Sequence, residues 1–263
     1  MTLRNQLRCA RWLGVAAAVP VTVLLRSLGP VSPYRIPLIL VFLVSFFLYL
    51  FGVFVWLTGR AQRRIGRLNE AQDYEGARRL IEELRAVHPA SPATTRMFQL
   101  VEGTQLSLES RHPAAVSVLS SIDAAQLRAA SRPTYLNNLA WSLALSGNAA
   151  DAVLRARESL AASEAAGKAA KLPRANQIGT LGTALVLAGE ADEGVTRLEE
   201  ALLLGGKPAA QATRAFFLGE GMRALGRYDD AAKAYRRAVE EAPSSEFGQR
   251  AKVSLQGLAA YRS

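Results

Sequence analysis

Residues 218–243 read LGEGMRALGRYDDAAKAYRRAVEEAP, two helix-forming stretches joined by a short turn that contains glycine. Gly219 stands twelve residues before Ala231, and a small residue at both points allows two antiparallel helices to approach closely. The same spacing of small residues recurs twice upstream, in the pairs Gly182 and Gly194, and Ala140 and Ala152. A fixed recurrence of such pairs indicates a stacked array of helical repeats, which usually binds something and seldom reacts with it.

Single residues of this segment have mechanical explanations. Gly226 is able to adopt the left-handed conformation that ends a helix. Asp229 and Asp230 stand at the start of the next helix, where the helix dipole favours acidic side chains. We expect Tyr228 to pack in the turn and Pro243 to end the second helix.

The pattern resembles the tetratricopeptide repeat. The residues that carry the resemblance are Leu218, Gly219, Met222, Gly226, Tyr228, Ala231, Tyr235, Ala238 and Pro243. Four upstream units fit with losses, and the anchor positions Ala77, Ala115, Ala152, Gly194 and Ala231 are 38, 37, 42 and 37 residues apart. The family period is about 34 residues, so we expect longer connections, the widest of them around residues 165–171. An ordinary alanine-rich helical bundle is the alternative.

The resemblance implies an all-α fold, a TPR-like α-solenoid of antiparallel helix pairs. We expect about five such pairs over residues 60–243. Residues 244–263 follow as one more amphipathic helix, which would cap the exposed end of the array. Its predicted apolar side consists of Phe247, Val253, Leu255 and Leu258.

The net charge of +10 invites a nucleic-acid-binding interpretation, but the distribution of charge opposes it. Residues 1–67 hold nine arginines and no acidic residue, whereas residues 68–263 hold 23 basic and 22 acidic side chains. The repeats are therefore almost neutral. We expect no nucleic-acid partner.

Residues 36–59 carry no charge and would span about 36 Å as a helix, enough to cross a hydrocarbon core. Arg35 and Arg60 flank the segment, and Tyr49 and Trp56 approach its far end as interfacial aromatic residues do. We therefore predict a membrane anchor over residues 1–59 with a transmembrane helix at 36–58. The lipid bilayer is accordingly an expected partner.

A shorter uncharged run covers residues 12–25 and could extend to about residue 28. It is short for a span and contains Pro20. A second spanning helix, a signal-peptide core and an interfacial helix all remain open, and a helical hairpin is favoured because a second apolar run follows.

Arginines gather outside the two hydrophobic runs, three before the first and four after the second, with only two between them. By the positive-inside rule, this pattern predicts a repeat domain that faces the cytoplasm. Arginine greatly outnumbers lysine and alanine is abundant, which favours a GC-rich bacterial genome and the bacterial inner membrane.

The sequence lacks the motifs of enzymes and metal sites. Cys9 is the only cysteine, so no intrachain disulfide is possible, and the two histidines, His88 and His112, have no second ligand at metal spacing. No phosphate loop, nucleophile elbow or paired-carboxylate motif is present. We expect no catalysis, no cofactor and no metal.

In the resembled family, the first helices of the pairs line a concave groove that binds extended peptides or helices. By that resemblance, the candidate groove residues here are Leu100, Thr104, Asn137, Trp141, Asn176, Thr183, Phe216, Glu220 and Arg223. Trp141 could serve as an anchor for a partner, or it could pack against a neighbouring repeat. Basic residues are not aligned with Asn138, so the family's clamp for a terminal carboxylate is not expected.

The hypothesis that follows is a membrane-anchored adaptor that recruits a protein partner in its groove. The alternative is a self-assembling structural subunit, which would make a homo-oligomer, or a component of a membrane, envelope-assembly or transport complex.

Overall fold

The computed structural model describes residues 5–6, 9, 35–88 and 91–261, and the regular elements among them are all helices. The expected all-α fold is confirmed. The chain divides into two units, residues 1–98 and 99–263. The hydrophobic run predicted to be a second span, about residues 12–28, lies outside the described residues.

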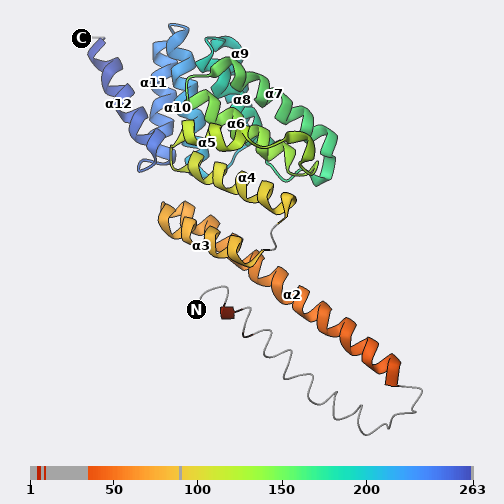
Figure 1. Ribbon diagram of the computed structural model, residues 1–263. Coiled ribbons are helices and arrows are strands. Elements are labelled where there is room, and N and C mark those ends of the chain that lie inside the picture. The colour runs from red at the N-terminus through yellow and green to blue at the C-terminus, as the bar shows by residue number, and fades with distance from the viewer. Residues whose placement is uncertain (1–4, 7–8, 10–34, 89–90, 262–263) are drawn as a thin grey trace. The chain divides into compact units, whose positions relative to one another are not determined.

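In the first unit, the helices α2 (Arg35–Glu70) and α3 (Tyr74–Val87) form an antiparallel pair (Figure 1). Ala61 of α2 and Ala77 of α3 are both buried. Asp73 begins α3, because its side chain accepts a hydrogen bond from the Gly76 backbone N–H at 2.8 Å. The boundary predicted between residues 59 and 60 falls inside α2, so one continuous helix joins the apolar segment to the repeats.

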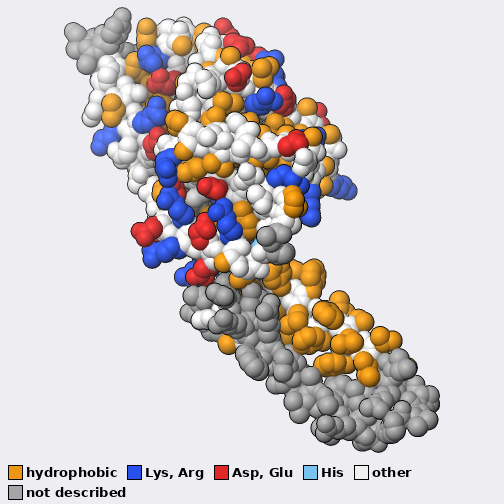
Figure 2. All heavy atoms as spheres, viewed as in Figure 1, with side chains coloured by type: hydrophobic (Ala, Val, Ile, Leu, Met, Phe, Trp, Pro, Cys, Tyr) orange, Lys and Arg blue, Asp and Glu red, His pale blue; other side chains and the backbone are white. Residues whose placement is uncertain are grey.

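The apolar part of α2 buries almost none of its side chains within the chain, and Figure 2 shows them as an exposed hydrophobic surface. Among the described helices, residues 39–70 of α2 form the one stretch with the length and composition to cross a bilayer, and its most apolar window is unburied. The large exposed side chains are Leu40, Val41, Leu43, Val44, Phe47, Leu48, Tyr49, Phe51, Val55 and Trp56.

The second unit is a stack of helix pairs (Figure 1). Its elements are α4 (Pro92–Leu108, from Gln99 onward), α5 (His112–Ser120), α6 (Arg132–Leu145), α7 (Ala149–Ala166), α8 (Arg174–Leu187), α9 (Ala191–Leu203), α10 (Pro208–Ala224), α11 (Tyr228–Glu241) and α12 (Glu246–Tyr261), with short 3₁₀ turns at Ala124–Gln126 and Gly167–Ala169. The first helices α6, α8 and α10 pack side by side, and each second helix packs on the next first helix. This arrangement places the first helices together on one face.

The small residues found in the sequence lie where the paired helices touch. A Cβ atom on Gly182 of α8 would be 3.0 Å from the Gly194 carbonyl oxygen of α9, and a Cβ atom on Gly219 of α10 would be 2.5 Å from the Tyr235 ring of α11. A side chain at either position would force the neighbouring helix or ring to shift. The predicted turn geometry is confirmed at Gly226, whose φ is +74°.

The structure bears on three further predictions, which concern the long step at α7 and the side chains of Tyr228 and Val253. The wide step between the third and fourth anchors is explained by α7, whose 18 residues are followed by a 3₁₀ turn. Tyr228, the first residue of α11, is 40% exposed and borders a cavity that α10 and α12 also line. Val253 was predicted on the apolar side of the last helix but is 67% exposed, whereas Phe247 is buried and Leu255 and Leu258 pack, partly buried, against the core.

Candidate partner-binding groove

The first helices enclose a concave cavity of about 360 Å³ in the second unit. Side chains from α4, α6, α8 and α10 line it, and the first turn of α12 lies at one edge. The lining residues are Thr104, Ser107, Leu108, Ser110, His112, Asn137, Asn138, Trp141, Leu145, Asn176, Gly179, Thr180, Thr183, Ala210, Thr213, Arg214, Glu246 and Phe247. Nine of these eighteen residues carry a hydroxyl or an amide, and the others include Trp141, Phe247 and two leucines, so the wall is mixed polar and apolar.

The structure brings together five of the nine residues that the sequence suggested for the groove, namely Thr104, Asn137, Trp141, Asn176 and Thr183. Phe216, Glu220 and Arg223 line a second cavity instead, of about 820 Å³, between α10 and α12. Leu100 packs, partly buried, against the core around α6. Whether these residues bind a partner stays a prediction.

Aromatic rings form the wall between the two cavities. Trp141 of α6 is partly buried and meets Phe217 and Phe247 edge to face, with ring centroids 6.1 and 6.0 Å apart. Phe247 also contacts Phe216 at 5.5 Å. Trp141 therefore packs against neighbouring elements and also borders the cavity, and its role as an anchor for a partner stays a prediction.

Arg214 of α10 is the one lining residue with a buried positive charge, at 4% exposure. Its Nη1 donates to the carbonyl oxygens of Ala201 and Gly205, at 3.2 and 2.8 Å, and to Gln211 Oε1 at 2.9 Å. Its Nη2 donates to Asn176 Oδ1 at 2.8 Å. Burial lowers the pKa of Arg214 from its ordinary value, since desolvation disfavours a charged group.

The opposite wall of the cavity holds a short polar network. Asn138 donates to Thr104 Oγ1 at 2.8 Å, which joins α6 to α4. Ser142 Oγ donates to Ser107 Oγ at 3.1 Å between the same two helices. These bonds fix neighbouring first helices in register. Asn137 belongs to the same helix, but its Oδ1 is buried and has no hydrogen-bond partner.

His112 and Glu246 meet at the edge of the cavity where α5 and α12 begin. Ser110 Oγ donates to Glu246 Oε2 at 2.9 Å, a contact between residues 136 positions apart. His112 is buried, and its Nδ1 has no partner. Desolvation lowers the pKa of His112, and the nearby Glu246 carboxylate partly opposes this shift.

The second cavity centres on Glu220. Its carboxylate accepts the Tyr235 hydroxyl at 2.6 Å and the Arg223 guanidinium at 2.7 Å. Burial of Tyr235, together with its bond to Glu220, raises the pKa of the phenol well above its ordinary value. The guanidinium of Arg250 lies over the Phe216 ring, 4.9 Å from the centroid. The charged and polar groups of this cavity are therefore paired with one another. We interpret the cavity as a packing junction between helices rather than as a binding site.

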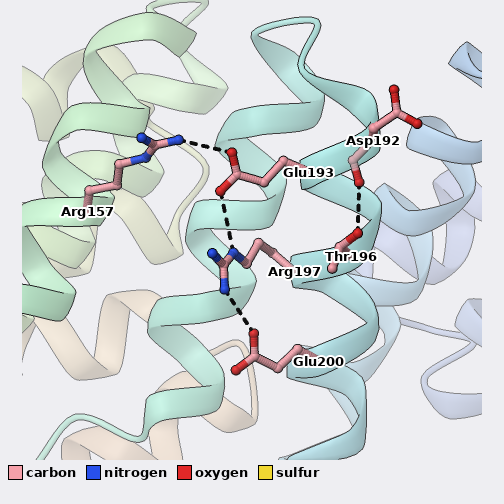
Figure 3. Close-up of polar contacts among 6 residues, drawn as sticks. All are labelled: Arg157, Asp192, Glu193, Thr196, Arg197 and Glu200. Atoms are coloured by element: carbon pink, nitrogen blue, oxygen red, sulfur yellow. Dashed lines mark hydrogen bonds and ion pairs between the residues drawn. The ribbon is translucent and has the colours of Figure 1, made fainter.

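Outside both cavities, a chain of ion pairs joins the second helices α7 and α9 (Figure 3). Glu193 accepts Arg157 of α7 at 3.1 Å and contacts Arg197 at 3.5 Å, and Arg197 reaches Glu200 at 3.3 Å. All these side chains are between one third and about half exposed. These ion pairs connect two repeats on the surface, and none of their residues lines either cavity.

Sequence reasoning missed the residues that α12 and α10 contribute to the first cavity. Phe247 and Glu246 follow the last repeat, and no repeat pattern indicates where they return. Arg214 gave a signal that could have been used, because it is the one charge in the stretch AAQATRAFFLG of a first helix. Within the described residues, no group of three or more His, Cys, Asp or Glu side chains is placed to hold a metal ion.

Comparisons with known proteins agree with this geometry. Residues 212–245 match the family model described as Tetratricopeptide repeat, which covers most of α10 and all of α11. The apo form of Bacillus thuringiensis PlcR is similar over 81% of this chain and 82% of that chain, with 14% identity and a TM-score of 0.60. PlcR in complex with the peptide PapR7 and DNA is similar over 78% of this chain and 72% of that chain, with 13% identity and a TM-score of 0.56. None of the curated proteins compared with the sequence matches it.

Proposed function

Because the chain is a tetratricopeptide-repeat protein, we propose that it is a membrane-anchored adaptor whose first cavity binds an extended segment of a protein partner. The observation that carries the proposal is the cavity itself. Four successive first helices supply hydroxyl and amide groups to it, and Trp141 stands in its wall.

The chemistry of the lining suits a peptide main chain. Asparagine and threonine side chains both donate and accept hydrogen bonds, so they can pair with the alternating N–H and C=O groups of an extended segment. The partly buried Trp141 offers a rigid apolar face for one side chain of that segment. Nothing in this set of groups suggests a reaction, and we propose no catalysis.

The likeness to PlcR supports peptide binding at the level of the fold. One of the two PlcR structures is a complex with the peptide PapR7 and DNA. At 13% identity, the likeness extends to the fold alone, so the contacts must be argued from the residues of this chain. A nucleic-acid partner is not proposed here, since the charges of residues 68–263 nearly balance.

The exposed apolar surface of α2 supports anchoring in a bilayer. A helix of this length that buries none of its most apolar window needs a nonpolar environment. Anchoring would raise the concentration of the groove near membrane-bound partners without any added contact. We propose that the arginines after the span, Arg60, Arg63, Arg64 and Arg67, keep the repeats on the cytoplasmic side of a bacterial inner membrane.

Site-specific photo-crosslinking in cells tests the adaptor function. A photoreactive amino acid at Asn176, which lines the cavity, is compared with one at Glu199, which is exposed on α9 outside it. We expect a discrete crosslinked protein from position 176 alone. Equal products from both positions, or none from position 176, would contradict the proposal. A product consisting of a second copy of this chain would support the self-assembling subunit instead.

Fusion of reporters to the C-terminus tests the orientation in a bacterial host. We expect a fluorescent GFP fusion and an inactive alkaline phosphatase fusion, both in membranes that resist carbonate extraction. An active phosphatase fusion would place the repeats on the other side, and release by carbonate would remove the anchor from the proposal.

A further inference from the structure

The buried guanidinium of Arg214 has no carboxylate to balance it. Its four hydrogen-bond acceptors are two carbonyl oxygens and two amide oxygens, all neutral, and among the described residues no carboxylate contributes to its electrostatic environment. A buried charge without a partner is costly. Such a charge at the wall of a cavity calls for an anion inside the cavity.

The position of Arg214 is built by its surroundings. Nη1 is held at the C-terminal end of α9, by the carbonyl oxygens of Ala201 and Gly205, where the helix dipole favours a cation. The side chain lies across Gly179, where a Cβ atom would come within 2.9 Å of Nε. Because α8 has glycine at this point, the guanidinium can reach the cavity wall beside Asn176.

The same cavity contains buried polar atoms that lack partners. Asn137 Oδ1 and His112 Nδ1 have no hydrogen-bond partner, and both residues are only 8% exposed. Buried polar groups are nearly always paired, so these atoms point to a ligand or ordered water within the cavity. An acceptor such as Asn137 Oδ1 requires an N–H or O–H donor. The cavity therefore has two unmet requirements. Arg214 has no anion to balance its charge, and Asn137 Oδ1 has no hydrogen-bond donor.

We propose that the first cavity selects a ligand whose carboxylate pairs with Arg214 and the Asn176 amide, while an N–H group of the same ligand donates to Asn137. This inference rests on the proposed peptide-binding function and names the chemistry of the peptide, an acidic residue within the bound segment. A free amino acid carries the same two groups and is the other source of this chemistry.

A carboxylate fits this site better than a phosphate. Arg214 is the one cationic side chain that lines the cavity, and Glu246 contributes a negative charge at its edge. A phosphate ester carries nearly two negative charges at neutral pH and is usually bound by several cations or helix N-termini. One guanidinium balances one carboxylate, and its planar fork matches the carboxylate geometry.

The test uses the full chain in detergent, immobilised and exposed to random hexapeptides that are acetylated and amidated. We expect the captured peptides to be enriched in Asp or Glu at one position, about tenfold, as the loss of a charge-assisted hydrogen bond would imply. A second pool with free C-termini shows whether a terminal carboxylate is taken instead. The third arm measures thermal melting in sodium glutamate against sodium chloride of equal ionic strength, which reports a free amino acid.

Asn176→Asp is the decisive variant, because it places a carboxylate at the position from which Asn176 Oδ1 accepts Arg214 at 2.8 Å. This internal counter-charge should leave folding intact and abolish both the acidic enrichment and any stabilisation by glutamate. Asn148→Asp is the charge-matched control, on the exposed start of α7 away from the cavity, and should behave as wild type.

Each outcome decides the inference separately from the proposed function. Capture of peptides without acidic enrichment, or equal enrichment in Asn176→Asp, overturns the carboxylate site and leaves peptide binding standing. If Asn148→Asp loses the acidic enrichment to the same extent, the effect is explained by net charge, and the carboxylate site is overturned. Absence of both capture and glutamate stabilisation overturns the inference as well, whereas the crosslinking at position 176 judges the adaptor function.

Discussion

Trp141 of α6 and Phe247 of α12 meet edge to face, with their ring centroids 6.0 Å apart. The two residues are 106 positions apart in the sequence, and the contact brings the last helix onto the groove of an earlier repeat. α12 therefore does more than cover the end of the array, because its first turn forms part of the groove wall.

Phe247→Ala should destabilise the second unit by about 3 kcal/mol, since the ring is buried among three other aromatic rings. Trp141→Ala should cost less, about 2 kcal/mol, because that ring is only partly buried, and it should also weaken partner capture. Val253→Ala, on the exposed side of α12, is the control and should change the free energy of unfolding by under about 0.5 kcal/mol. Denaturant unfolding followed by circular dichroism measures all three, and equal effects at Phe247 and Val253 would contradict the position of α12.

Ala231→Leu should overpack the α10–α11 pair and cost about 1–3 kcal/mol, because Ala231 is fully buried beside the glycine-lined face of α10. Ala224→Leu adds the same atoms at an exposed position of α10 and should leave the melting temperature near that of wild type. If the two variants melt alike, the close approach of the helices is not a constraint.

Acidification should weaken the second unit through His112. The pKa of His112 is lowered in the folded state by burial, so its neutral form stabilises the fold above the ordinary pKa of about 6.5. That contribution should be lost as the pH falls from 7 towards 5. We expect His112→Gln to flatten the dependence of the free energy of unfolding on pH in this interval.

The measurement uses the fluorescence of Trp141 in a chain whose other tryptophans, Trp12 and Trp56, are replaced by phenylalanine. His88→Gln, in the first unit, removes the other histidine and should retain the slope of wild type. A slope that persists in His112→Gln would assign the acid sensitivity to other groups.

Glu193→Gln should cost less than about 1 kcal/mol although it breaks the ion-pair chain between α7 and α9, because exposed pairs are screened by water and salt. Chemical unfolding of the variant and of wild type, at low and high salt, provides the measurement. A loss of several kcal/mol would mean that the surface charges hold the repeats together more strongly than the helix packing does.

The repeat frame was predictable from the sequence because its determinants are local. A small residue and its partner twelve positions later belong to one helix pair, so the spacing from Gly219 to Ala231 alone indicates where α10 and α11 touch. Gly226 marks the turn for the same reason, as its positive φ is a property of one residue. The apolar helix was predictable from composition, since a long uncharged run has few alternatives.

The contents of the groove depended on the tertiary structure. Five suggested residues line the cavity, but the burial of Arg214, the return of Phe247 to Trp141 and the unpaired Asn137 Oδ1 involve several repeats at once. These contacts follow from the packing of one helix pair on the next, and no spacing within a single repeat encodes that packing. The sequence by itself thus determined the helix pairs and the apolar helix, whereas the stacking of the pairs decided which side chains share the cavity, because contacts between repeats depend on the orientation of whole helices.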